Sequence, residues 1–129
     1  MSFASLVKVD HIIYKQRSYV LVGQKDNDEF RKAVEVDHHD CRLGKWYEGE
    51  GRTVFGEMPS FKQLLVPHGK VHDSVKMAVG LLDQKWERDT GVQDKIIEAM
   101  NAAEEASMSV MQILDKIVEE KHPHMVKVA

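Results

Sequence analysis

A pair of histidines is the clearest chemical feature of the sequence. His68 and His72 are four residues apart in the segment His-Gly-Lys-Val-His. On a helix, this spacing places both imidazoles on one face, one above the other. Two imidazole nitrogens held in this way are suitable ligands for zinc and related metals. A zinc protease of the common helical type needs a glutamate directly after the first histidine, and Gly69 stands there. By itself, such a pair fits a metal site but also arises by chance in a chain with seven histidines, and it disfavours hydrolysis of that kind.

Cys41 is the only cysteine of the chain, so no internal disulfide is possible. A single free thiol fits the reducing cytoplasm, where it stays available for metal or redox chemistry. We expect Cys41 at the N-terminus of a short helix, where unpaired N–H groups and the helix dipole favour the thiolate. The alternative is a small buried hydrophobic residue. That alternative fits poorly with the flanking polar residues, which are Asp37, His38, His39 and Asp40.

His11 lies on the apolar stripe of a predicted first helix, with Val7, Tyr14, Ser18 and Leu21. Taken alone, it is best interpreted as a core histidine with a hydrogen-bond partner. If it joins the other candidates, three imidazoles and one thiolate make a closed tetrahedral zinc site. Such a site has no open position for a substrate. It predicts a structural or sensory role and no enzymatic activity.

Four further residues are candidates for supporting the ligands. Asp37 and Asp40 would orient a ligand histidine or contact an oxidised sulfur, but N-capping or solvated carboxylates are the alternative. Tyr14 is expected to pack near the metal, and Trp46 to anchor the short helix to the core. His38 and His39 are spare imidazoles that we expect to be mostly solvated.

The elements that must position these side chains are helices. Apolar residues recur at helical spacing and strand signals are weak, so we predict an all-α fold, a four-helix bundle with a short additional Cys-bearing helix. Asn27 or Asp28 is expected to cap a short second helix, Asp40 the Cys-bearing helix, and Ser60 with Gln63 to open a long helix as a capping box. Residues 52–59 are predicted to be a loop.

The predicted helices are 2–24, a segment within 26–36, 41–48, a long helix from 60 with Pro67 in its first turns, and about 92–121, ended by Pro123. The predicted inward-facing residues include Leu65 and Met108 on the two long C-terminal helices.

Length and composition fit one domain over residues 1–129. The chain has 129 residues, 43% of them hydrophobic, which is enough for a core without disulfides. A net charge of −3 without a long basic block argues against nucleic-acid binding. No apolar run approaches the ~20 residues of a membrane span, and the N-terminus does not resemble a signal peptide. We expect a cytoplasmic protein.

Three ordered elements of the sequence resemble the chemoreceptor zinc-binding domain family. The first is the segment from His11 to Tyr14, similar to a His-x-x-aromatic element. The second is the segment Cys-Arg-Leu-Gly-Lys-Trp at 41–46, which resembles a Cys-x-Leu-Gly-x-Trp core. The third is the histidine pair at 68–72. The gaps between the elements are also similar, and the resemblance covers essentially the whole chain.

This resemblance implies one zinc ion per chain, bound by His11, Cys41, His68 and His72. It also implies a homodimer, attached in its parent protein to a signalling output domain of a chemoreceptor or a diguanylate cyclase. In receptors of this kind, the zinc-bound thiolate, here Cys41, is proposed to sense oxidants such as hypochlorous acid. The segment RLGKWYEGEG favours a receptor origin.

Two other functional classes stay open at this point. Glu35–His38 and Glu119–His122 have the Glu-x-x-His spacing of di-iron bundles, which would suggest an iron protein or another metalloenzyme. One of these elements falls in a predicted loop and the other at a helix end, so coincidence is the better explanation. The third class is an inert dimerisation bundle whose histidines are core residues.

Overall fold

The computed structural model describes residues 3–122, and the regular elements among them are helices, with no β-strand. The predicted all-α fold is confirmed. No helix of the described part has both the length and the hydropathy needed to cross a bilayer. The α-helices are α1 (Phe3–Gly23), α2 (Asp28–Val34), α3 (Arg42–Glu48), α4 (Glu50–Phe55), α5 (Leu65–Leu81) and α6 (Thr90–Lys121), with two 3-10 helices at Phe61–Leu64 and Trp86–Arg88.

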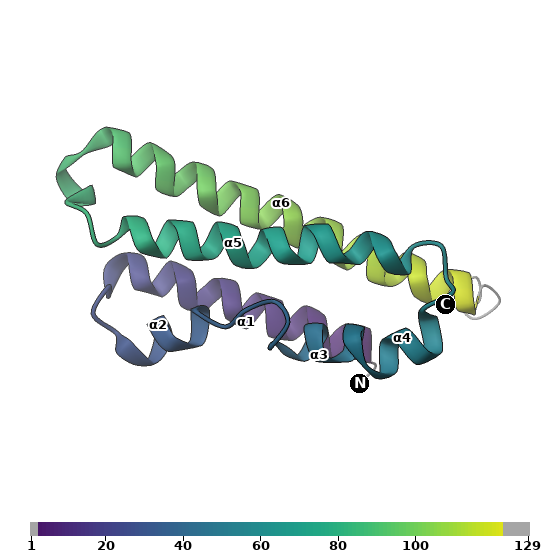
Figure 1. Cartoon of the computed structure of the whole chain (residues 1–129). Coiled ribbons are helices and arrows are strands. Elements are labelled where there is room, and N and C mark those ends of the chain that lie inside the picture. Colours follow the sequence, from purple (N-terminus) through teal and green to yellow (C-terminus); the bar gives the residue numbers. More distant parts are fainter. Residues whose placement is uncertain (1–2, 123–129) are drawn as a thin grey trace.

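Three long helices and one interrupted segment make the bundle. Helices α5 and α6 lie antiparallel and side by side, with α1 packed along them (Figure 1). Helices α2, α3 and α4 together run back along α1 and take the fourth place of the bundle (Figure 1). The short Cys-bearing helix is therefore one part of an interrupted fourth segment.

The apolar core divides into two clusters. One contains Leu21, Val75 and Ile96, and the other contains Val7 and Leu114 together with the side chains of α3. A band of buried polar side chains interrupts this interior on α1, α5 and α6: His11, Ser18, His68, His72 and Ser107. On α1, His11 stands between Val7 of one cluster and Leu21 of the other, and on α5 His72 stands between Val71 and Val75. Buried polar groups are costly unless they have partners.

The first two helices form as predicted. On α1, Val7, His11, Ser18 and Leu21 are all buried. Helix α2 is capped by Asn27, whose side-chain oxygen accepts a hydrogen bond from the Phe30 amide at 3.1 Å. This cap satisfies one of the unpaired N–H groups at the helix start.

The predicted capping box at Ser60 is wrong. The Ser60 hydroxyl donates to the Glu120 carboxylate (2.8 Å) on α6, and a 3-10 turn separates Ser60 from α5. Pro67 lies in the first turn of α5, where a backbone N–H would have no partner within the helix, so proline is tolerated there. Leu65 is 43% exposed rather than buried, whereas its neighbour Leu64 and the rest of the predicted stripe face the core.

The segment after Cys41 differs from the prediction in two ways. Cys41 itself, not Asp40, is the N-cap of α3. Residues 50–55, mostly predicted as loop, form α4. Glycines in this segment suggested only chain breaks. However, a Cβ at Gly51 would lie 2.6 Å from the Trp46 ring, so this glycine permits close packing of α4 on α3.

Helix α6 begins two residues earlier than predicted, because the Asp89 side chain accepts from the Gly91 and Val92 amides. Its inward stripe also differs, since Met108 is 62% exposed. The helix ends at Lys121. Pro123, the residue predicted to end this helix, lies outside the described residues.

Candidate metal centre

Three histidine side chains meet inside the bundle. His11 comes from α1, and His68 and His72 come from successive turns of α5; they are 4%, 3% and 2% exposed. Their ligand atoms all lie within 4.8 Å of one another. The rings stand nearly perpendicular in pairs, with centroids 5.0 to 6.3 Å apart. Nitrogens at these separations are close enough to share one ion.

The orientation of two of these rings is set by backbone carbonyls. Nδ1 of His11 lies 3.0 Å from the Val7 carbonyl, and Nδ1 of His72 lies 2.8 Å from the Val36 carbonyl. A carbonyl only accepts, so each Nδ1 carries the proton and each Nε2 presents a lone pair. Such hydrogen bonds behind the ring are typical of metal-binding histidines.

One buried nitrogen gives a direct test of whether a metal fits. Nε2 of His72 is buried and has no hydrogen-bond partner among the described residues. An unsatisfied buried polar atom costs about 1–3 kcal/mol. A cation between the three imidazoles would remove this cost, because the free lone pair would become a ligand.

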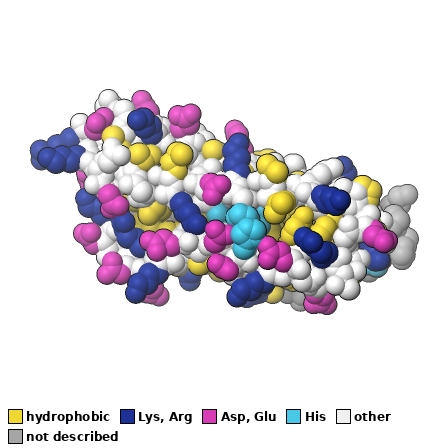
Figure 2. Space-filling model, in the orientation of Figure 1, with side chains coloured by type: hydrophobic (Ala, Val, Ile, Leu, Met, Phe, Trp, Pro, Cys, Tyr) yellow, Lys and Arg dark blue, Asp and Glu magenta, His cyan; other side chains and the backbone are white. Residues whose placement is uncertain are grey.

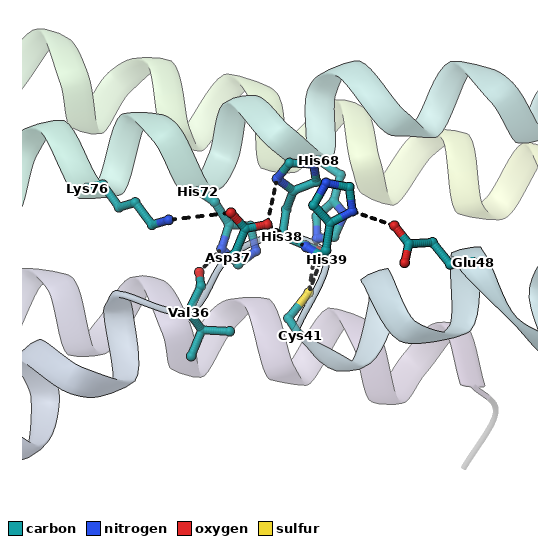
Figure 3. Close-up of polar contacts among 9 residues, drawn as sticks. All are labelled: Val36, Asp37, His38, His39, Cys41, Glu48, His68, His72 and Lys76. Atoms are coloured by element: carbon teal, nitrogen blue, oxygen red, sulfur yellow. Dashed lines mark hydrogen bonds and ion pairs between the residues drawn. The ribbon is translucent and has the colours of Figure 1, made fainter.

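Cys41 supplies a sulfur at the edge of the histidine cluster. Its Sγ lies 3.2 Å from Nε2 of His68, and its thiol donates to the His38 carbonyl at 3.5 Å. Figure 3 shows Cys41 below the α5 histidines with its sulfur directed towards them. Zinc in proteins is bound by imidazole nitrogens and thiolates, and four such ligands complete a tetrahedral site. The residues present therefore fit a zinc ion.

Burial sets the protonation of the imidazoles. Loss of hydration lowers the pKa of His68 to about 3 and that of His72 to about 4, and it also lowers the pKa of His11. All three rings are therefore neutral at physiological pH. Neutral imidazole is the form that binds metals.

Two opposing effects act on the thiol. The Gly44 and Leu43 amides at the start of α3 favour the thiolate, as predicted, but the loss of hydration on burial is the larger effect and raises the pKa of Cys41. A coordinated cation reverses this balance, since a coordinating thiol is deprotonated outright.

Tyr14 and Trp46 support the centre through packing. The Tyr14 ring lies 4.7 Å from the His72 ring, and its hydroxyl donates to the Val34 carbonyl at 3.1 Å. Tyr14 thus contacts a candidate ligand and ties α1 to α2. Trp46 stacks on Phe3 at 4.8 Å and anchors α3 beside Cys41.

The two acidic candidates make no side-chain hydrogen bond to the candidate ligands among the described residues, although Asp40 lines the same cavity as Cys41. The Asp37 carboxylate accepts from the His39 amide (2.9 Å) and lies near His38 and Lys76. Asp40 is exposed, and its amide donates to the Asp37 carbonyl at 2.9 Å. The Asp37 side chain thus contacts the spare histidines and Lys76, while its backbone carbonyl also accepts from the Cys41 amide at 3.3 Å.

His38 lies closer to the centre than sequence reasoning suggested. Its ring is 5.7 Å from that of His68 and rests over Gly69, where a Cβ would lie 3.7 Å from the imidazole. Its side chain is 23% exposed, whereas that of His39 is 53% exposed. The only signal in the sequence was the position of His38 three residues before Cys41.

A cavity of about 400 Å³ reaches the centre from the side of α1. His11, Tyr14, Cys41 and His72 line its inner part. A space of this volume admits small molecules, so Cys41 is reachable from outside the bundle.

Gly44 fixes the approach of α3 to the loop before it. A Cβ at this position would lie 1.8 Å from the His38 carbonyl oxygen, and no side chain can avoid that backbone atom. We expect Gly44→Ala to destabilise the protein by about 1–3 kcal/mol, the usual cost of overpacking, and to weaken zinc binding by displacing Cys41. Chemical denaturation with a zinc-competition assay measures both. Gly80→Ala, where nothing lies within 4 Å of the added Cβ, is the matched control. Equal stability of the two variants would contradict this account.

The fold and the centre define a class: an all-helical domain with three buried imidazoles and a thiol converging from α1, α5 and the start of α3. The model of the chemoreceptor zinc-binding domain family matches residues 11–79, more than half of the chain. The chain belongs to this family, and His11, Cys41, His68 and His72 all lie within the matched segment. No curated protein and no solved structure matched the chain.

Proposed function

We propose that this chain is a zinc-dependent regulatory module of a bacterial signalling protein, and that Cys41 is its redox-responsive residue. One zinc ion per chain would be held by His11, Cys41, His68 and His72. The observation that supports this most directly is the 3.2 Å approach of the Cys41 sulfur to Nε2 of His68, beside two further buried imidazoles. Family membership supports zinc as the metal.

The donor set favours regulation over catalysis. Four protein ligands complete a tetrahedral site, whereas catalytic zinc keeps one position for water or substrate. The module would therefore act through its shape and its contacts with an output domain.

The signal would reach the centre as a small oxidant. A bound zinc ion would keep Cys41 as the nucleophilic thiolate. The Cys41 thiolate would attack the chlorine of hypochlorous acid, so that an S–Cl bond forms while hydroxide leaves with the electrons of the O–Cl bond. Water would then displace chloride from the sulfur and lose a proton to give the sulfenic acid, so that two electrons pass from sulfur to chlorine. The cavity lined by Cys41 supplies the route.

The structural response would arise in residues 37–50. Cys41 begins α3, and Gly49 separates α3 from α4. If the sulfur no longer holds its position, this segment loses one of its ties to α5. The proposed setting is the cytoplasm, with the module working as a homodimer attached to a chemoreceptor output domain. Exposed apolar side chains on α1 and α6, among them Ile12, Tyr19 and Met108, support the dimer.

Titration with hypochlorous acid tests this proposal. We expect zinc release and Cys41 sulfenate to rise together, and amide hydrogen exchange to increase within residues 37–50. Zinc release is measured with a chromophoric chelator, and the sulfenate by trapping and mass spectrometry. The control is Cys41→Ser reconstituted at high zinc. If that variant shows the same exchange response, oxidation of Cys41 is not the signal.

A further inference from the structure

A second group of metal-binding side chains lies on the surface next to the buried centre. Asp37, His38 and His39 belong to the connection between α2 and α3, and their ligand atoms all lie within 4.8 Å of one another. Figure 2 shows histidine at the surface midway along this face, with acidic side chains beside it. Figure 3 places His38 and His39 in front of α5, with Asp37 to one side and Glu48 to the other.

The polar contacts of this group draw the donor atoms together. Nδ1 of His38 lies 3.4 Å from the Asp37 carboxylate, and the two imidazole centroids are 4.1 Å apart. Nδ1 of His39 contacts the Glu48 carboxylate. Lys76 lies beside the group. Its Nζ is 3.9 Å from the Asp37 carboxylate, and its side chain is 38% exposed. A long, exposed lysine at that distance is readily displaced by a divalent ion.

We propose that Asp37, His38 and His39, with Glu48, form a second divalent-metal site that is separate from the buried centre. Two imidazoles and one or two carboxylates favour zinc, copper(II) or nickel(II) over the oxygen-preferring calcium and magnesium. The site contains no sulfur. It is also solvent-accessible, so its ion exchanges more freely than one bound inside the bundle.

The two sites share one loop. The thiol of Cys41 donates to the backbone carbonyl of His38, and the His38 ring lies beside His68. An ion on Asp37, His38 and His39 would therefore hold the segment that carries Cys41. The buried centre cannot respond to further metal once it is filled. The surface site would then respond to a rise in metal concentration.

Titration of the metal-free chain with cobalt(II) separates the two sites. A thiolate ligand gives a sulfur-to-cobalt charge-transfer band in the near ultraviolet, and a site with only nitrogen and oxygen donors does not. We expect the wild type to bind a first equivalent that produces this band and a second equivalent that does not. His39→Gln and Asp37→Asn should each lose the second equivalent and keep the band, which also shows that the bundle is intact.

Two further variants make the assignment specific. Cys41→Ala should lose the charge-transfer band and keep the sulfur-free equivalent, so failure of the buried centre is distinguishable from failure of the surface site. His122→Gln with His124→Gln removes two other histidines of the sequence and should leave both equivalents in place. The proposal is overturned if the wild type binds no second equivalent. It is also overturned if that equivalent persists in His39→Gln or disappears in the His122/His124 variant.

Discussion

Removing zinc from the purified chain is expected to lower its melting temperature by roughly 12–20 °C. Free zinc at a thousand times its dissociation constant stabilises the folded state by about 4 kcal/mol. A chain of 129 residues shifts by roughly 3–5 °C for each kcal/mol. After chelation, Nε2 of His72 stays buried without a partner, and three neutral imidazoles occupy the band between the two apolar clusters.

Differential scanning calorimetry before and after chelation measures this effect, and added zinc should restore the original melting temperature. His72→Ala is the comparison variant, because it removes the orphaned nitrogen together with a proposed ligand. It should show a much smaller change on chelation. An unchanged melting temperature in the wild type, with zinc loss verified by elemental analysis, would mean that the ion does not stabilise the bundle.

Replacing Cys41 with serine is expected to weaken zinc binding more than a hundredfold. Mutations of residues that hydrogen-bond to metal ligands typically lower the metal affinity 10- to 100-fold. Loss of a ligand itself should lower the affinity further. The hydroxyl of serine is nearly the size of the thiol but is a poor ligand at neutral pH. Competition with a chelator of known affinity measures the change.

His39→Gln is the control for this experiment. His39 is close in sequence to Cys41, but its side chain is 53% exposed and contacts Glu48 rather than the buried histidines. We expect it to leave the affinity of the buried centre unchanged. Equal affinities for Cys41→Ser and the wild type would remove the sulfur from the ligand set and with it the proposed redox response.

Local patterns predicted most of the helices and the helix face of His11. The spacing of His68 and His72 places both rings on one side of α5 whatever surrounds it, and the apolar stripe of α1 turns His11 inward. These inferences need only the helical repeat. The convergence of the two helices with Cys41 was anticipated only by family resemblance, and the four-ligand zinc set stays a prediction.

The errors have a different origin, which is packing between elements. Ser60 is paired with Glu120, a residue 60 positions away, so its local capping pattern was misleading. Gly51 looked like a helix breaker, yet it is required by the Trp46 ring that packs against it. The place of His38 over Gly69 depends on the path of the loop between α2 and α3. The partners of Ser60 and His38 lie outside any short window of sequence, and the packing of Gly51 on Trp46 depends on a turn between α3 and α4 that the sequence pattern does not show.

The two-part core has a consequence for how the molecule opens. Separate apolar clusters tend to behave as separate cooperative units, which unfold with different free energies. The unit containing α3 and α4 includes most of the interrupted segment, whereas the unit around Val75 and Ile96 is formed largely by continuous helices. The histidine band stands where the two clusters meet along α1 and α5, so we expect a change there to loosen one end of the domain while the opposite end keeps its shape. A module of this design can transmit a local chemical event without losing its overall fold.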